Sequence, residues 1–192
     1  MMAIRKSRRE WFGGIAYSEN PGFTAFVDKK RADALGISPA ENLEEGLFSA
    51  PLDVHISITS RCNLRCKGCY ATSPEEPQKD MPLELAQGII DRLSAMNVFT
   101  VALGGGEPFL HPKLFEIAAC AREKSIVPNI TTNGLLINPE TARKCQVFGS
   151  VHLSCHHQSE LPRLKEAVRN FKDAGIDLGI NLLLSAETYE EL

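Results

Sequence analysis

Hydrophobic and polar positions follow a repeating order from about residue 52 onward. Strand-like apolar runs occupy residues 54–58, 99–103, 126–131, 150–154 and 178–184. The segments between them, such as 83–93 and 161–171, place apolar residues three or four positions apart, which is the period of an amphipathic helix. Strands that alternate with helices predict βα units joined by right-handed crossovers. The pattern therefore predicts an α/β fold with a mostly parallel, five-stranded sheet.

The first fifty residues show a different pattern. Two short apolar runs, 11–17 and 23–27, flank the turn-forming residues 18–22 and predict a β-hairpin with a five-residue loop. A short helix is expected over residues 28–35, followed by an irregular connection. The basic residues near the start of the chain are expected to form a solvated end; they are Arg5, Lys6, Arg8 and Arg9.

Two regions follow from these patterns. Residues 1–50 form an N-terminal hairpin and linker, and residues 51–192 form the α/β core. Residues 187–192 resemble the start of another helix directly after the fifth core strand. A parallel sheet that stops there keeps an open edge. We therefore expect an incomplete core, truncated after its fifth strand, with the hairpin as a small extension.

Composition and charge exclude several classes of function. The chain has 192 residues and a net charge of −3, so no overall basic field points to a nucleic acid or an anionic membrane. No segment approaches the roughly 18 consecutive apolar residues of a membrane span, and the first residues lack the apolar stretch of a secretory signal. We therefore expect a cytoplasmic protein. In that compartment its six cysteines are expected to be reduced, so that a cluster of them indicates metal binding or catalysis.

Three cysteines lie close together directly after the first core strand, at Cys62, Cys66 and Cys69. Loops at the carboxyl ends of parallel strands are where α/β proteins place their sites. The spacing lets one loop curl around a single inorganic centre, and Gly68 permits a tight turn. A [4Fe–4S] cluster normally takes four thiolates, so three would leave one iron open to a small molecule. Zinc with a fourth ligand from elsewhere is the alternative, and the local spacing does not separate the two.

The other three cysteines, Cys120, Cys145 and Cys155, are scattered through predicted helices and strands. Free cysteine is among the most frequently buried residue types. We therefore expect these three to be small buried hydrophobic residues without a role in chemistry.

A glycine run follows the second core strand; it consists of Gly104, Gly105 and Gly106, with Glu107 and Pro108 directly after it. Glycines let backbone groups approach a ligand without side-chain obstruction, and the Glu107 carboxylate can accept from an ammonium group. Alone, such a run is typical of an ordinary strand-to-helix turn. Its position one βα unit after the three-cysteine loop makes the combination a much stronger signal than either motif alone.

With both motifs in place, the chain resembles the radical S-adenosylmethionine (radical SAM) superfamily. The resemblance rests on the Cys-x3-Cys-x2-Cys run and on the Gly-Gly-Glu-Pro sequence at residues 105–108. Supporting matches are Asn63-Leu64, His111-Pro112 and the Thr-Thr-Asn-Gly sequence at residues 131–134. It covers about residues 52–192.

The resemblance implies a partial (β/α)6 TIM-like barrel in which the three cysteines hold a [4Fe–4S] cluster. The open iron of that cluster would bind the amino and carboxylate groups of S-adenosylmethionine. Gly104, Gly105 and Gly106 would line the methionine amine, with Glu107 nearby. Ser154 matches a position that contacts the methionine carboxylate, and Asn181 matches one that meets the ribose. For both residues the alternative is a polar side chain that is simply satisfied at a strand end.

The implied activity is reductive cleavage of S-adenosylmethionine to a 5′-deoxyadenosyl radical, which abstracts hydrogen from an unknown substrate. Such chemistry requires a one-electron reductant of the flavodoxin or ferredoxin type. Residues 9–17 resemble the opening of superfamily members that modify ribosomally made peptides. A peptide-modifying maturase that lacks its cysteine-rich, SPASM-type C-terminal domain is therefore the expected subclass, with a peptide as substrate.

The chain departs from the family pattern at two motifs, and as a third departure the sixth strand and any C-terminal domain are expected to be missing. The residue before the third cysteine is usually aromatic, whereas here it is Gly68, so Tyr70 is expected to pack against the adenine instead. The fourth strand usually continues into Ser-x-Asp-Gly, whereas here Ser154 precedes Cys155, His156 and His157. These two histidines are expected to face solvent, with substrate contact or metal binding as alternatives. For the whole chain the alternatives are a zinc-stabilised, non-catalytic α/β binding module and an inactive truncated remnant.

Overall fold

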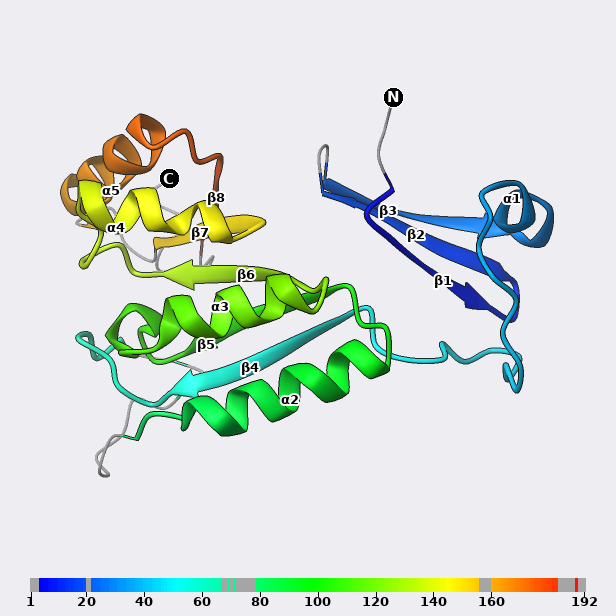
Figure 1. Cartoon of the computed structure of the whole chain (residues 1–192). Helices are drawn as coiled ribbons and strands as arrows, with labels where there is room; N and C mark the ends of the chain where they lie inside the picture. Colours follow the sequence, from blue (N-terminus) through cyan, green and yellow to red (C-terminus); the bar gives the residue numbers. More distant parts are fainter. Residues whose placement is uncertain are drawn as a thin grey trace.

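The structure, a computed structural model, describes residues 4–19, 22–66, 69, 71, 79–155, 160–182 and 189. Within these residues the chain forms a three-stranded antiparallel sheet near its N-terminus and a five-stranded parallel sheet beyond it (Figure 1). The expected α/β core and N-terminal hairpin are both present. The expected helix start over residues 187–192 falls almost wholly outside the described residues, as do the last two positions of the fifth predicted strand.

The strands of the parallel sheet lie in the order of the chain. In spatial order they are β4 (Asp53–Thr59), β5 (Thr100–Gly105), β6 (Val127–Thr132), β7 (Ser150–Cys155) and β8 (Leu178–Leu182). Each strand pairs in parallel with the next, as Ile56 does with Leu103 and Ser154 with Asn181. Parallel neighbours of this kind bring all the carboxyl ends of the strands to one edge of the sheet. The predicted strand sequence of the core is therefore confirmed.

Helices between the strands supply the other half of the core. They are α2 (Leu83–Ala95), α3 (Leu114–Glu123), α4 (Pro139–Lys144) and α5 (Leu161–Asp173), with the short 3-10 turns η1 (Pro108–Leu110) and η2 (Cys145–Val147). The fully buried Ile90, Ile117 and Phe171 belong to the same apolar cluster as Val101 and Leu103 of β5. Side chains at alternate strand positions point away from these helices, so the opposite, inner face of the sheet carries a separate set of residues. None of the described helices is long and apolar enough to cross a membrane.

The N-terminal part contains β1 (Lys6–Glu10), β2 (Gly13–Glu19), β3 (Gly22–Asp28) and the short helix α1 (Lys29–Ala34). The predicted hairpin is confirmed as β2 and β3. These strands pair as far as Glu19 and Gly22, so the loop between them is shorter than predicted. Asp28 caps α1 by accepting a hydrogen bond from the amide of Arg31 at 2.7 Å.

The expectation of a solvated basic chain end is wrong, because residues 6–10 form β1 and only 6% of Arg8 is exposed. The Arg8 guanidinium donates to the carbonyl oxygens of Ala50 at 2.7 Å and Pro51 at 3.0 Å. Its Cζ lies 5.2 Å from the centroid of the Phe99 ring, and Phe99 directly precedes β5 of the core. The N-terminal sheet is thus fastened to the linker and the core, and a division of the chain at residues 50 and 51 stays a prediction.

Candidate functional site

A cavity of about 620 Å³ opens at the carboxyl-terminal edge of the parallel sheet. This volume lies in the range of small-molecule sites, roughly 300–1,000 Å³. The cavity brings together every described residue that the sequence analysis assigned to a cofactor, namely Cys62, Cys66, Cys69, Gly104, Gly105, Gly106, Glu107, Ser154 and Asn181. Tyr70, His156 and His157 lie outside the described residues.

The three cysteines line the cavity as free thiols. Cys62 and Cys69 are half-buried, and Cys66 is exposed. The amide of Leu64 donates to Sγ of Cys62 at 3.4 Å, and the amide of Cys69 donates to the carbonyl oxygen of Cys66 at 3.3 Å. Burial raises the pKa of the Cys62 and Cys66 thiols, and the negative charge of neighbouring thiolates raises it further. As placed, the described residues hold no group of three histidine, cysteine or acidic side chains close enough for a single metal ion.

The glycine loop lies directly against the start of the cysteine loop. The amide of Gly106 donates to the carbonyl oxygen of Thr59 at 2.9 Å, and the amide of Glu107 donates to that of Arg61 at 2.7 Å. A Cβ at Gly106 would overlap the Arg61 carbonyl, and Gly105 has a φ of +124°, which side chains rarely allow. The two loops are therefore in direct contact, and this contact requires glycine at positions 105 and 106.

Two inner-face histidines each lie against a glycine of the next strand. A Cβ at Gly104 would overlap the imidazole of His55 on β4, and a Cβ at Gly179 would overlap that of His152 on β7. His55 lines the cavity together with Gly104. Sequence reasoning missed His55, although its place between the apolar Val54 and Ile56 indicates the inner face of a strand.

Glu107 is buried at the back of the cavity, with 1% of its surface exposed. Its carboxylate accepts from the hydroxyl of Thr132 at 2.7 Å, the amide of Asn133 at 2.9 Å and the amide of Phe109 at 3.2 Å. Burial raises the pKa of Glu107, and these hydrogen bonds offset only part of that effect. The carboxylate thus joins the glycine loop to the end of β6, while its predicted place beside an ammonium group stays a prediction.

Ser154 and Asn181 face the cavity from β7 and β8. The Asn181 side chain donates to the hydroxyl of Thr131 at 3.3 Å, so part of its hydrogen-bonding capacity is used inside the sheet. Their assignment to the carboxylate and the ribose stays a prediction.

Arg163, in the first turn of α5, lines the same cavity and was missed by the sequence analysis. Its guanidinium pairs with Glu160 at 3.0 Å, and its Nε is buried without a hydrogen-bond partner among the described residues. One arginine on an amphipathic helix carries no sequence signal of a site, because many such residues face solvent. The fold turns this one toward the cavity.

The scattered cysteines match their expected environment in two cases out of three. Cys145 and Cys155 are buried, whereas Cys120 is half-buried. Burial raises the pKa of Cys145 to about 12, and its thiol donates to the carbonyl oxygen of Thr141 at 3.2 Å. Such a thiol is not a nucleophile or ligand at neutral pH.

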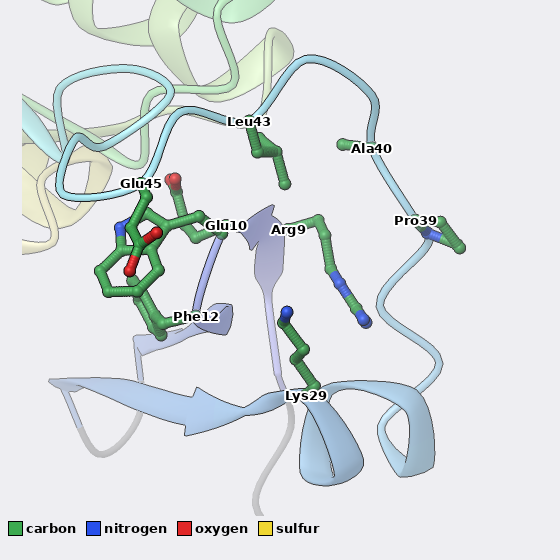
Figure 2. Close-up of a pocket in the computed structure, with 9 residues that line it drawn as sticks. Arg9, Glu10, Phe12, Lys29, Pro39, Ala40, Leu43 and Glu45 are labelled. Atoms are coloured by element: carbon green, nitrogen blue, oxygen red, sulfur yellow. The ribbon is translucent and has the colours of Figure 1, made fainter.

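A second cavity, of about 790 Å³, lies in the N-terminal part of the chain. Figure 2 shows Arg9 and Lys29 on one side of this space and Glu10, Phe12 and Glu45 on the other. No cysteine lines it, and the described residues predicted to bind a cofactor line the first cavity.

A parallel βα sheet that carries a three-cysteine loop and a glycine loop on one cavity, at the carboxyl ends of its strands, defines an enzyme core for a metal centre beside a small-molecule cofactor. A family model for the Radical SAM superfamily matches residues 56–192, and the chain belongs to this superfamily. The resemblance seen in the sequence is thereby confirmed, and the zinc-stabilised module is not favoured. A [4Fe–4S] cluster and S-adenosylmethionine are the cofactors of this superfamily.

Individual relatives cover different shares of the chain. Mycofactocin maturase MftC of Mycobacterium ulcerans (strain Agy99) is 33% identical over 129 residues, which is 67% of this chain and 35% of that protein. Fe-coproporphyrin III synthase of Methanosarcina barkeri (strain Fusaro / DSM 804) is 33% identical over 127 residues, covering 59% of this chain and 32% of that protein. The chain therefore spans about a third of the length of these curated relatives.

Solved structures agree with the fold over the whole chain. SuiB of Streptococcus suis bound to S-adenosylmethionine has a TM-score of 0.74 at 19% identity, with 100% of this chain and 59% of that chain covered. SuiB bound to the precursor peptide SuiA has a TM-score of 0.72 at 21% identity over the same shares. At this identity the likeness concerns the fold, which is that of a partial TIM-like barrel with an N-terminal antiparallel sheet.

Proposed function

We propose that the chain is the cofactor-binding core of an enzyme that cleaves S-adenosylmethionine reductively and uses the resulting 5′-deoxyadenosyl radical to abstract hydrogen from a peptide. The observation that carries this proposal is the single cavity lined by three free cysteines and a glycine loop in a member of the radical SAM superfamily. The chain spans only about a third of the length of its curated relatives, so the activity of a whole enzyme is itself part of this proposal.

The residues present fit a cluster with one open iron. Thiolates are the ligands that iron–sulfur clusters take, and Cys62, Cys66 and Cys69 all line the cavity. When bound, the cluster supplies one electron to the sulfonium of S-adenosylmethionine. The protein's own task is to hold the two cofactors together and to exclude water and oxygen.

The remaining cavity residues would hold S-adenosylmethionine. Gly104, Gly105 and Gly106 leave room for the methionine part beside the cysteine loop, with Glu107 behind them. Ser154 and Arg163 would bind the carboxylate, since the Nε of Arg163 is a charged donor without a partner among the described residues. Asn181 would meet the ribose and Tyr70 the adenine.

A peptide substrate is supported by the relatives rather than by a residue of the cavity. One relative is named a mycofactocin maturase, and one structural neighbour was solved with a precursor peptide. The likeness to that neighbour extends over the N-terminal sheet. We further propose an electron donor of the flavodoxin or ferredoxin type and a cytoplasmic location, where thiols stay reduced.

The test is anaerobic reconstitution of the chain with iron and sulfide, followed by electron paramagnetic resonance of the reduced protein with and without S-adenosylmethionine. We expect a [4Fe–4S] signal that changes when S-adenosylmethionine is added, together with formation of 5′-deoxyadenosine. Cys66→Ala should lose the signal. Cys120→Ala, a change at a half-buried cysteine outside the cavity, should keep it. A colourless chain that takes up zinc and forms no cluster would overturn the proposal.

A further inference from the structure

One asparagine connects the two loops of the cofactor cavity. Asn133 follows β6 directly and is 9% exposed. Its side-chain Nδ2 donates to Oδ1 of Asn63 in the cysteine loop at 2.7 Å, and its backbone amide donates to Oε2 of Glu107 in the glycine loop at 2.9 Å. Its Oδ1 accepts from the amide of Leu135 at 3.0 Å, so the side chain is fixed from both ends.

The neighbours of Asn133 hold it in place. The Thr132 hydroxyl donates to Oε1 of Glu107 at 2.7 Å and accepts from the amide of Gly134 at 3.1 Å. Gly134 has a φ of +81°, a left-handed conformation that glycine adopts at low cost. The turn after β6 is therefore held by hydrogen bonds where it meets both loops.

Within the described part of the cysteine loop, hydrogen bonds run from the amide of Leu64 to Sγ of Cys62 at 3.4 Å and from the amide of Cys69 to the carbonyl oxygen of Cys66 at 3.3 Å. The bond from Asn63 to Asn133 is short and joins positions 70 residues apart. A second short hydrogen bond, from the Glu107 amide to the Arg61 carbonyl oxygen at 2.7 Å, ties the start of this loop to the glycine loop, so its described residues are held from two neighbouring strand ends.

We propose that Asn133 is a positioning residue for the cluster. Its amide fixes the loop that carries Cys62 and Cys66 through Asn63, and its backbone fixes Glu107 behind the glycine loop. The two halves of the cofactor cavity are thereby held in one arrangement by a residue that itself ligates nothing. This inference rests on the proposed cluster, so its test starts from chain that has been reconstituted with iron and sulfide.

The first measurement is the rate at which the reconstituted chain loses its cluster to an iron chelator, followed by visible absorbance. Asn133→Ala should lose the cluster roughly tenfold faster, which corresponds to about 1.4 kcal/mol and to one ordinary hydrogen bond. Asn138→Ala is the matched control, because Asn138 caps α4 through the amide of Thr141 at 2.8 Å and lies away from the cavity. It should lower the melting temperature and leave the rate of cluster loss unchanged.

An exchange of amides for carboxylates separates a hydrogen bond from simple packing. Asn63→Asp and Asn133→Asp should each keep a near wild-type rate, because the remaining amide can rotate to donate to the new carboxylate. The double variant brings two acceptors together, so it should lose the cluster at least as fast as Asn133→Ala. A packing role would instead give additive effects of the two single changes.

The outcomes distinguish this inference from the proposed function. If wild-type chain forms a cluster but Asn133→Ala and the double aspartate variant lose it at the wild-type rate, the positioning role is wrong and the proposed function stands. If wild-type chain forms no cluster, both are wrong.

Discussion

Two glutamates, one in each sheet region of the chain, are buried to the same degree, and their surroundings differ. Glu10 in β1 and Glu107 in the glycine loop are each 1% exposed. Glu10 pairs with the Arg8 guanidinium at 2.7 Å and accepts from the amide of Ser49 at 2.9 Å. Glu107 accepts three hydrogen bonds from neutral donors and forms no ion pair within the described residues. The negative charge of Glu10, where the two sheets meet, is thus balanced by Arg8. The carboxylate of Glu107, beside the cavity, is held by neutral donors alone within the described residues.

This difference indicates which of the two regions carries groups that could take part in chemistry. At the joint, the Arg8 guanidinium also donates to backbone carbonyls and packs on the Phe99 ring, so its hydrogen-bonding capacity is used within the protein. At the cavity, a carboxylate of raised pKa, three thiols and the partly paired Arg163 face one space. Perturbed and unpaired groups that converge on a cavity are typical of functional sites.

Breaking the pair at the joint should have the largest effect on stability. Glu10→Ala leaves Arg8 buried without its anion, and such a loss costs about 3–5 kcal/mol. Urea denaturation should show this decrease in the free energy of unfolding. Asp33→Ala in the adjoining helix α1 is the control, since Asp33 pairs with Arg9 of β1 but is 66% exposed in its side chain. It should cost about 0–1 kcal/mol. Equal losses in the two variants would contradict the comparison.

The free energy of unfolding should depend on pH because of the buried carboxyl group of Glu107. The pKa of Glu107 is raised in the folded chain above its ordinary value of 4.5, so the folded state holds its proton more tightly than the unfolded state. Its contribution to stability is therefore complete below pH 4.5 and is lost as the pH rises through the raised pKa. The loss amounts to about 1.4 kcal/mol for each pH unit between the two pKa values.

Glu107→Gln removes this titration and provides the reference for it. The free energy of unfolding of wild-type chain, minus that of the variant, should fall as the pH increases above 4.5 and then level off. Urea titrations at a series of pH values measure this difference. A difference that is constant across the whole range would show that Glu107 has no raised pKa.

Removing the cation at the cavity should have the smallest effect on stability and a clear effect on binding. Arg163 and Glu160 form a partly exposed pair, with side-chain exposures of 21% and 18%, so Arg163→Met should change the free energy of unfolding by less than about 1 kcal/mol. Loss of a charged donor should weaken the binding of S-adenosylmethionine at least roughly tenfold. Titration of reconstituted chain, followed by paramagnetic resonance, measures that affinity. Unchanged affinity would remove Arg163 from the site.

The elements with a strong period were predictable from the sequence, and the tertiary contacts were not. The predicted strand 150–154 is β7, because its alternating pattern reflects one face on the helices and one on the cavity. β1 was missed because Lys6–Glu10 has no apolar residue, and its strand depends on pairing with β2 and on the burial of Arg8. Local patterns do not record such long-range support.

The residues of the candidate site also fall into two groups, those that the sequence identifies and those that only the structure identifies. The cysteines and glycines stand out because their spacing is itself chemical information, and the cavity brings both motifs together. Arg163 and the bond between Asn63 and Asn133 are invisible in the sequence, since each depends on segments that meet only after folding. Sequence motifs thus identify the groups that would hold the cofactors, and the structure identifies the groups that hold those motifs in place.

The histidines that lie over glycines on neighbouring strands restrict how this barrel can diversify. The imidazole of His55 occupies the space in which any side chain at position 104 would begin, and His152 does the same at position 179. A side chain at position 104 therefore requires His55 to change its rotamer or to be replaced by a smaller residue, and position 179 is coupled to His152 in the same way. The shape of the inner face is thus coupled between neighbouring strands, so that a substitution on one strand shifts a ring on the strand beside it.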